Sequence, residues 1–400
     1  MKITHYREIS GHSTRFYVFM ALLAILIAAG LAAAHYMESH GHYVTGMTNQ
    51  VVWGIPHVFA IFLILSASGA LNVASISSVF DRELYKPLAR LSGLLAITLL
   101  AGGLATLVLD LGRPDRLIVA MTTYNFRSIF AWNIFLYTGF FIVVAVYLWF
   151  MMEPRMNRYV KPAGFFAFFW RLTLTTGTGS IFGFLVAREA YNSAILAPMF
   201  ILMSFLFGLA VFMLFLMGAF HWTGRPLGDE VVRRLKNLLG IFIGSVLYLV
   251  AVYHLTNLYI AQRHGIEEFI LVHGGIYTAL FWIGQVLIGG IIPLVLVYHP
   301  KLCRSRRLIA LAAALVIVGA FAQLYVIIIG GQAYPLILFP GKIVSSSFYD
   351  GVINTYTPSL PEIALGLGAV ALSIFLASIA IKVLPFLPET LADIPSDGTK

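Results

Sequence analysis

The stretch LAPMFILMSFLFGLAVFMLFLMGAF occupies residues 196–220 and contains no charged side chain. A helix needs about 20 mostly apolar residues to cross a bilayer, because roughly 30 Å of hydrocarbon is crossed at about 1.5 Å per residue. This stretch is therefore predicted to span a membrane. Nine further segments have a similar length and apolar character, namely 16–34, 56–80, 91–109, 129–150, 163–186, 238–260, 270–297, 308–329 and 363–384.

The composition of the whole chain also indicates an integral membrane protein. Hydrophobic residues make up 60% of the 400 positions and charged residues 11%, whereas soluble domains are about 25% charged. We therefore expect one all-α membrane domain over residues 1–400, a polytopic bundle of about ten transmembrane helices. Two similar bundles are expected at 16–150 and 163–297, followed by two C-terminal helices at 308–384.

The distribution of Lys and Arg predicts the orientation of these helices. The N-terminal segment and the connections on its side of the membrane contain 17 Lys and Arg, whereas the opposite connections contain six. Cytoplasmic loops carry the excess, so both termini are predicted to be cytoplasmic. The first segment is longer than the apolar core of a signal peptide and is taken as helix one. The formal charge of +9 then reflects topology and does not indicate nucleic acid binding.

Cys303 is the only cysteine of the sequence. A single cysteine cannot form an intrachain disulfide or ligate an iron–sulfur cluster held by several cysteines of this chain. Most of the 11 histidines fall in predicted loops or termini, and the two facing pairs that a two-haem cytochrome needs cannot be assembled. We expect no haem, no cluster and no metal here, so any bound electron carrier belongs to a partner.

One predicted helix carries a charge in its interior, which costs about 2.5–3.5 kcal/mol in a membrane. Arg171 lies well inside the segment 163–186. At about 100° per residue, Thr175, Thr178 and Glu189 fall on the same face if the helix continues. This stripe is either a proton path, or a place where Arg171 fixes helix packing through carbonyls and hydroxyls.

Polar residues of several predicted helices gather toward the outer side. His57 begins the second segment, and Asp110 and Arg113 follow the third. A lone histidine more often just faces the interface, and acids and bases at a helix end can pair among themselves. Convergence from separate helices nevertheless favours a functional site. The other polar residues of this half are Tyr253, His254, Asn257, His273 and Tyr277.

Residues 331–361 form the longest predicted connection, with four prolines among aromatic residues. A segment of this kind is typical of an ordered cap and not of a helix. The cap either receives a docked partner or folds onto the ends of its own helices.

Short motifs at three places resemble one known family. They are Trp53 and Gly54 before the second segment, Asp110, Gly112 and Arg113 after the third, and Tyr356, Pro358, Ser359 and Glu362 before the last. The chain resembles the polysulfide reductase membrane subunits, the NrfD-like family, over nearly its whole length. Within that family it looks most similar to the ten-helix branch that accompanies dissimilatory sulfite reductase.

The resemblance implies a subunit of a multi-subunit redox complex in the bacterial inner membrane. Such a subunit exchanges electrons between the quinone pool, menaquinone or ubiquinone, and a periplasmic iron–sulfur ferredoxin-like partner. The other implied partners are a multihaem cytochrome c, further membrane and cytoplasmic subunits, and membrane lipid. The implied process is dissimilatory sulfur metabolism, and no haem or metal is expected in a subunit of this kind.

A quinone that gains two electrons also gains two protons, so its oxygens need hydrogen-bond donors and a proton source. We expect Asp110 to relay a proton, Arg113 to hold its charge in place, and His57 and Tyr124 to bind the quinone. His57 departs from the hydrogenase-type pattern of the family, which places an aromatic residue near this point. Its role is inferred from its chemistry.

A proton-coupled secondary transporter is the alternative function, because such carriers also bury residues like Arg171 and Glu189. Discontinuous helices in matching positions of the two halves would favour transport, and no clear pair is visible in the sequence.

Overall fold

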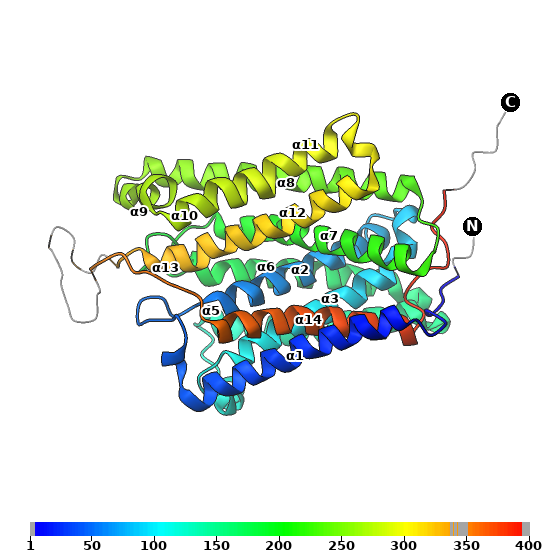
Figure 1. Ribbon diagram of the computed structural model, residues 1–400, viewed down its shortest axis with the longest axis horizontal. Coiled ribbons are helices and arrows are strands. Elements are labelled where there is room, and N and C mark those ends of the chain that lie inside the picture. The colour runs from blue at the N-terminus through cyan, green and yellow to red at the C-terminus, as the bar shows by residue number, and fades with distance from the viewer. Residues whose placement is uncertain (1–4, 337–338, 340–341, 343–350, 394–400) are drawn as a thin grey trace.

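The computed structural model describes residues 5–336, 339, 342 and 351–393. Within these residues the chain is helical and contains no β-strand, only two isolated bridges. Each of the ten expected segments forms a helix (Figure 1). They are α1 (Thr14–His40), α2 (Ile55–Ser78), α3 (Ala89–Leu109), α5 (Ile129–Met152), α6 (Val160–Gly183), α7 (Leu196–Thr223), α8 (Asp229–Tyr259), α10 to α11 (Ile276–Tyr298), α12 to α13 (Arg306–Ala333) and α14 (Leu360–Val383).

Two of these helices contain a wider, π-helical stretch. A third π-helix and several short helices occupy the connections. The π-helices are η6 (Phe269–His273), η7 (Leu280–Ile291), which joins α10 (Ile276–Ala279) to α11 (Ile292–Tyr298), and η9 (Val326–Gly330), which joins α12 (Arg306–Tyr325) to α13 (Gly331–Ala333). The short elements are α4 (Leu117–Thr122), α9 (His264–Glu268) and the 3-10 turns η1 (His42–Val44), η2 (Glu83–Leu88), η3 (Pro114–Arg116), η4 (Pro154–Tyr159), η5 (Ala261–Arg263) and η8 (Leu302–Arg304).

Nine helices in the described part of the chain are long and apolar enough to cross a membrane. α6 is not among these nine, because Arg171 and its threonines make it less apolar, but it is 24 residues long and packs between α2, α5 and α7. The expectation of a polytopic all-α bundle is confirmed.

The contacts divide the helices into two rings of four and one outer pair. α2, α3, α5 and α6 form the first ring, and α7, α8, α10 to α11 and α12 form the second. α1 packs mainly against α14, which in turn lies on α3 and α2. This division is shifted by one helix along the chain from the expected bundles at 16–150 and 163–297. α1 packs on the last helix, α6 belongs to the first ring, and α12 completes the second.

α2 and α7 form the main contact between the two rings, and glycines make their approach possible. A Cβ on Gly69 would lie 1.6 Å from the carbonyl oxygen of Ser204, and one on Gly208 would lie 2.2 Å from the nitrogen of Ala70. Small residues at helix crossings are typical of membrane proteins. The two backbones are therefore in direct contact near the centre of the molecule.

Both ends of the chain lie at the same end of the bundle, here called the terminal end, where residues 5–9 meet residues 381–389 (Figure 1). The backbone N–H of Arg7 donates to the carbonyl of Leu387 over 3.0 Å. The opposite end, where α2 begins and α3 ends, is here called the distal end. Much of the expected cap over 331–361 lies outside the described residues, although Asn354 bonds back to the carbonyl of Ala333 (2.9 Å).

Candidate functional site

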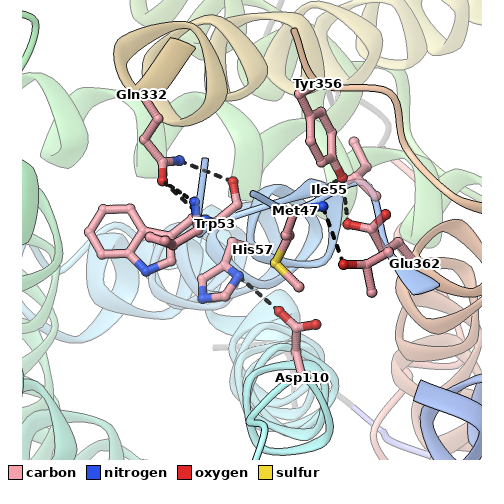
Figure 2. Close-up of polar contacts among 10 residues, drawn as sticks. Met47, Trp53, Ile55, His57, Asp110, Gln332, Tyr356 and Glu362 are labelled. Atoms are coloured by element: carbon pink, nitrogen blue, oxygen red, sulfur yellow. Dashed lines mark hydrogen bonds and ion pairs between the residues drawn. The ribbon is translucent and has the colours of Figure 1, made fainter. Parts of the chain in front are cut away.

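Two residues at the distal end form the centre of the site. Asp110 caps the C-terminal end of α3, and its side chain is 1% exposed. His57 lies in the first turn of α2, directly after Pro56, and its side chain is 24% exposed. The imidazole Nδ1 lies 3.0 Å from a carboxylate oxygen of Asp110 (Figure 2). The first ring thus joins a buried acid to a partly accessible base.

The carboxylate of Asp110 is poorly satisfied for a buried charge. Neither of its oxygens takes part in a well-aligned hydrogen bond within the described residues, because the close contact with His57 has unfavourable angles. A buried polar group without a hydrogen bond costs about 1–3 kcal/mol, and more when it is charged. Asp110 can therefore accept a further hydrogen bond, or stabilise a positive charge that forms on the imidazole.

An amide from the second ring fixes the backbone just before α2. The side chain of Gln332, at the end of the α12 to α13 helix, is fully buried. Its Oε1 accepts the N–H groups of Val52 and Trp53 at 3.0 Å each, and its Nε2 donates to the carbonyl of Trp53, also at 3.0 Å (Figure 2). The indole of Trp53 stacks beside His57, with ring centroids 6.1 Å apart. Gln332 therefore positions the neighbour of His57.

Arg188 ties the same region to the connection between α6 and α7. Its guanidinium donates to the carbonyl of Gln332 (2.9 Å) and to the carbonyl of Gln50 (2.7 Å). Burial lowers the pKa of Arg188, but a guanidinium stays charged in proteins. Sequence reasoning missed Arg188 and Gln332, and the only signal for Gln332 was a polar residue at the end of a long apolar helix.

A second buried acid closes the site on the side of α14. Glu362 is fully buried and accepts hydrogen bonds from the N–H groups of Gly46 and Ser359, both 2.8 Å, and from the hydroxyl of Tyr356 (2.6 Å). The same hydroxyl accepts the N–H of Ile55 over 2.7 Å. Burial, and then the hydrogen bond to Glu362, raise the pKa of Tyr356. Unlike Asp110, this carboxylate is fully hydrogen-bonded.

The motif residues before the second and last helices, among those that carried the family resemblance, meet at this point. A Cβ on Gly54 would lie 2.4 Å from a carboxylate oxygen of Glu362 and 2.6 Å from the hydroxyl of Tyr356. Only glycine therefore fits between Trp53 and α2, and the motifs before the second and last helices form one structural unit around the start of α2 (Figure 2).

An apolar groove reaches the same turn of α2 from the second ring. It has a volume of about 450 Å³ and runs along η7 and α12 to Ile55, two residues before His57. Phe321 and Tyr325 line it, and Tyr325 stands near Tyr356, with ring centroids 6.3 Å apart. The groove suits a long apolar chain.

The structure places Arg113 and Tyr124 away from this centre. The expected contact of Arg113 with Asp110 is wrong, because its guanidinium forms both of its hydrogen bonds with Asp115, at 3.0 and 3.1 Å. This exposed pair lowers the pKa of Asp115. The ring of Tyr124 stacks on Phe135 of α5 at 4.2 Å, and no described hydrogen bond or ring contact joins it to His57 or Asp110.

Arg171 is fully buried at the interface between the two rings. Its Nη2 donates to the amide oxygen of Asn72 over 2.8 Å, and its guanidinium lies over the rings of Phe168 (4.8 Å) and Phe205 (4.9 Å). Its Nε and Nη1 have no hydrogen-bond partner within the described residues. These contacts favour the packing interpretation of Arg171.

The proposed polar stripe along α6 is interrupted. Thr175 and Thr178 donate to carbonyls of their own helix, those of Arg171 (3.0 Å) and Leu174 (2.9 Å). The helical geometry that placed Glu189 on the same face does not apply, because α6 ends at Gly183 and Glu189 belongs to the following loop. The expectation that the helix continues to Glu189 is therefore wrong. A proton path through Arg171, Thr175, Thr178 and Glu189 stays an untested prediction.

Among the described residues, no three His, Cys, Asp or Glu side chains gather as a metal site, and the expected absence of metal stays a prediction. Comparison with known proteins identifies relatives over nearly the whole length of the chain. The integral membrane subunit of an Hdr-like menaquinol oxidoreductase from Archaeoglobus fulgidus is 29% identical over 387 residues, covering 96% of this chain and 97% of the relative. A putative dimethyl sulfoxide reductase membrane subunit from Halobacterium salinarum is 29% identical, covering 92% of this chain and 91% of the relative.

The integral membrane subunit of a menaquinone reductase from Nitratidesulfovibrio vulgaris is 22% identical, with 94% and 93% covered. The family profile described as polysulphide reductase, NrfD, matches residues 43–335, well over half of the sequence. The chain is thus a multi-pass membrane protein that belongs to the polysulphide reductase NrfD family.

Proposed function

We propose that this chain is the quinone-reactive membrane subunit of an oxidoreductase complex, and that His57 and Asp110 form its quinone site. The observation that carries the proposal is a buried carboxylate without a well-aligned hydrogen bond, 3.0 Å from a partly exposed imidazole. Two relatives are named as subunits of a menaquinol oxidoreductase and of a menaquinone reductase, which favours menaquinone over ubiquinone as the substrate.

The geometry supports a division of labour between the two residues. His57 is the accessible member of the pair, so its imidazole takes a proton from the quinol hydroxyl, or returns one to the quinone. Asp110 is buried behind it and stabilises the imidazolium, as a carboxylate does for a histidine base. The two hydroxyls of a quinol give their protons to His57 one after the other, the partly exposed imidazole releases each proton to solvent, and the two electrons pass to the partner subunit. The apolar groove that reaches Ile55 suits the isoprenoid tail.

The partners and the membrane orientation belong to the same proposal. The excess of Lys and Arg in the connections of the terminal end supports a cytoplasmic location for that end. The quinone site then faces the periplasm in a bacterial inner membrane, where an iron–sulfur ferredoxin-like subunit and a multihaem cytochrome c would dock. A role in dissimilatory sulfur metabolism fits this arrangement. The oxidoreductase function takes precedence over a transporter because three relatives are named as subunits of oxidoreductases or reductases.

Quinol oxidation by the assembled complex tests the proposal. Asp110→Asn retains the shape of the side chain but removes its charge, so turnover should fall by about 100-fold, the scale for a positioned acid–base group. Asp115→Asn is the matched control, because Asp115 is an exposed acid five positions further on. Its turnover should stay at the wild-type level. Wild-type turnover of a fully assembled Asp110→Asn complex would refute the proposed role.

A further inference from the structure

A second histidine–carboxylate pair lies at the distal end of the other ring, in α8 and α9 (Figure 1). The imidazole Nδ1 of His254 lies 2.6 Å from Oε2 of Glu267. The side chain of Glu267 is fully buried and that of His254 is 12% exposed. Neither residue belongs to the site around His57. A buried ionisable pair of this kind in a membrane protein calls for a functional explanation.

The side chain of Asn257 lies between the carboxylate of Glu267 and the guanidinium of Arg263. Its Oε1 accepts a hydrogen bond from Nδ2 of Asn257 over 2.8 Å, and Oδ1 of the same amide accepts one from Arg263 over 2.7 Å. A directly bonded guanidinium would hold the carboxylate in its charged form. Here the direct partners are an imidazole and a neutral amide, so the pair is able to gain and release a proton.

The other titratable groups near the pair do not bond to its carboxylate or imidazole within the described residues. Tyr253 of α8 donates its hydroxyl to the carbonyl of Ala190. Burial raises the pKa of Glu189, which lies in the same loop as Ala190, and the nearby positive charge of Arg263 acts in the opposite direction. Glu268 and His273 form an exposed ion pair at 3.4 Å. Glu267 and His254 are thus the buried acid and base that bond directly to each other here.

Two small cavities lie in the second ring, and His254 lines the first of them. The first is lined by His254, Gln285 and Gln323 among apolar residues, and offers about 20 Å³ for the centres of water-sized molecules. One water needs about 10–15 Å³ by this measure. The second offers about 10 Å³, shares both glutamines and is also lined by Gly289 and Gly319. The two cavities are therefore neighbours, and both glutamines border each of them.

Gln323 provides an independent indication that the first cavity holds water. Its side chain is 2% exposed, and its amide nitrogen is buried without a hydrogen-bond partner in the part of the chain that the structure describes. Ordered water usually satisfies such a group when a polar space adjoins it. The wall opposite is η7, and π-helical turns are frequent at functional sites.

We propose that His254 and Glu267 form a proton-binding site in the second ring, linked by water at Gln285 and Gln323 to the interior of the bundle. Glu267 takes up one proton to become a neutral carboxylic acid, and the imidazole and the water exchange that proton with their surroundings. The site is independent of the proposed quinone site and needs no residue of it.

Infrared difference spectra of the full chain in lipid nanodiscs, recorded across a pH titration, test this site. The wild type should show the carbonyl band of a titrating carboxylic acid that shifts in D₂O and is lost in Glu267→Gln. Glu362→Gln is the matched control, because Glu362 is equally buried but fully hydrogen-bonded to N–H and hydroxyl donors. It should leave the band unchanged.

A second variant keeps the test informative if Glu267→Gln does not fold. Gln323→Leu has a similar volume but cannot bond water, so the band should remain while its deuterium exchange slows by about tenfold, the effect of one lost hydrogen bond. Labelling of glutamate carboxyls with ¹³C should shift the wild-type band. A band that persists in Glu267→Gln, does not respond to the label, or exchanges at the wild-type rate in Gln323→Leu would overturn the proposal.

Discussion

Gln332→Leu is the substitution that most directly tests how the second ring supports the quinone site. The change removes four hydrogen bonds, those to the N–H of Val52, to the N–H and carbonyl of Trp53, and to the carbonyl of Ile328. The carbonyl of Ile328 keeps the hydroxyl of Tyr191 as a donor. Val52 is 49% exposed, so its N–H can regain water. The N–H and the carbonyl of Trp53 would stay without a partner, and each buried group left unpaired costs about 1–3 kcal/mol. We therefore expect a loss of about 2–6 kcal/mol in the free energy of unfolding.

The same change should displace Trp53 and, through ring stacking, His57. Thermal unfolding of the purified complex measures the loss of stability, and the KM for quinol, which should rise, reports the displaced site. Gln323→Leu is the matched control, because it makes the same replacement on the same helix but breaks no hydrogen bond within the described chain. If Gln332→Leu is as stable as Gln323→Leu, and KM is unchanged, Gln332 does not position the site.

Three further predictions concern two single residues and the cofactor content of the chain. Tyr356→Phe should lower the free energy of unfolding by about 1.5–3 kcal/mol, the value of a hydrogen bond to a charged group. Because the pKa of Tyr356 is raised in the folded protein, this contribution should be complete below pH 10 and disappear only as the pH rises further. Gly208→Ala should cost about 1–3 kcal/mol in thermal unfolding, since its Cβ would lie 2.2 Å from Ala70 N, whereas Gly218→Ala, with open space around it, should not. The purified subunit, freed of partners, should contain no stoichiometric iron by elemental analysis and show no haem Soret band.

The helices could be predicted from the sequence because membrane crossing depends on length and apolar character, which a sliding window measures directly. Even α6 was found, since a long apolar helix tolerates one buried Arg171. Helix ends were harder. Nothing in the sequence predicts that α6 ends at Gly183, and the mistaken position of Glu189 followed from that.

The partners within the site were predictable only in part. His57 and Asp110 were identified because each stands at the end of an apolar segment, where a polar residue is conspicuous. Arg113 was given the wrong partner, because the turn after α3 brings it to Asp115 and not to Asp110. The bond between Gln332 and Trp53 joins residues 279 positions apart, and helical periodicity contains no information on such a contact.

The central claim is that a quinone binds at His57, in front of Asp110. A cryo-EM structure of the complex with a bound menaquinone analogue tests it most directly. Our account predicts one quinone oxygen within about 3 Å of an imidazole nitrogen of His57, with the tail along the apolar groove that ends at Ile55. A quinone ring bound instead inside that groove beside Tyr325, with His57 free of ligand, would contradict it.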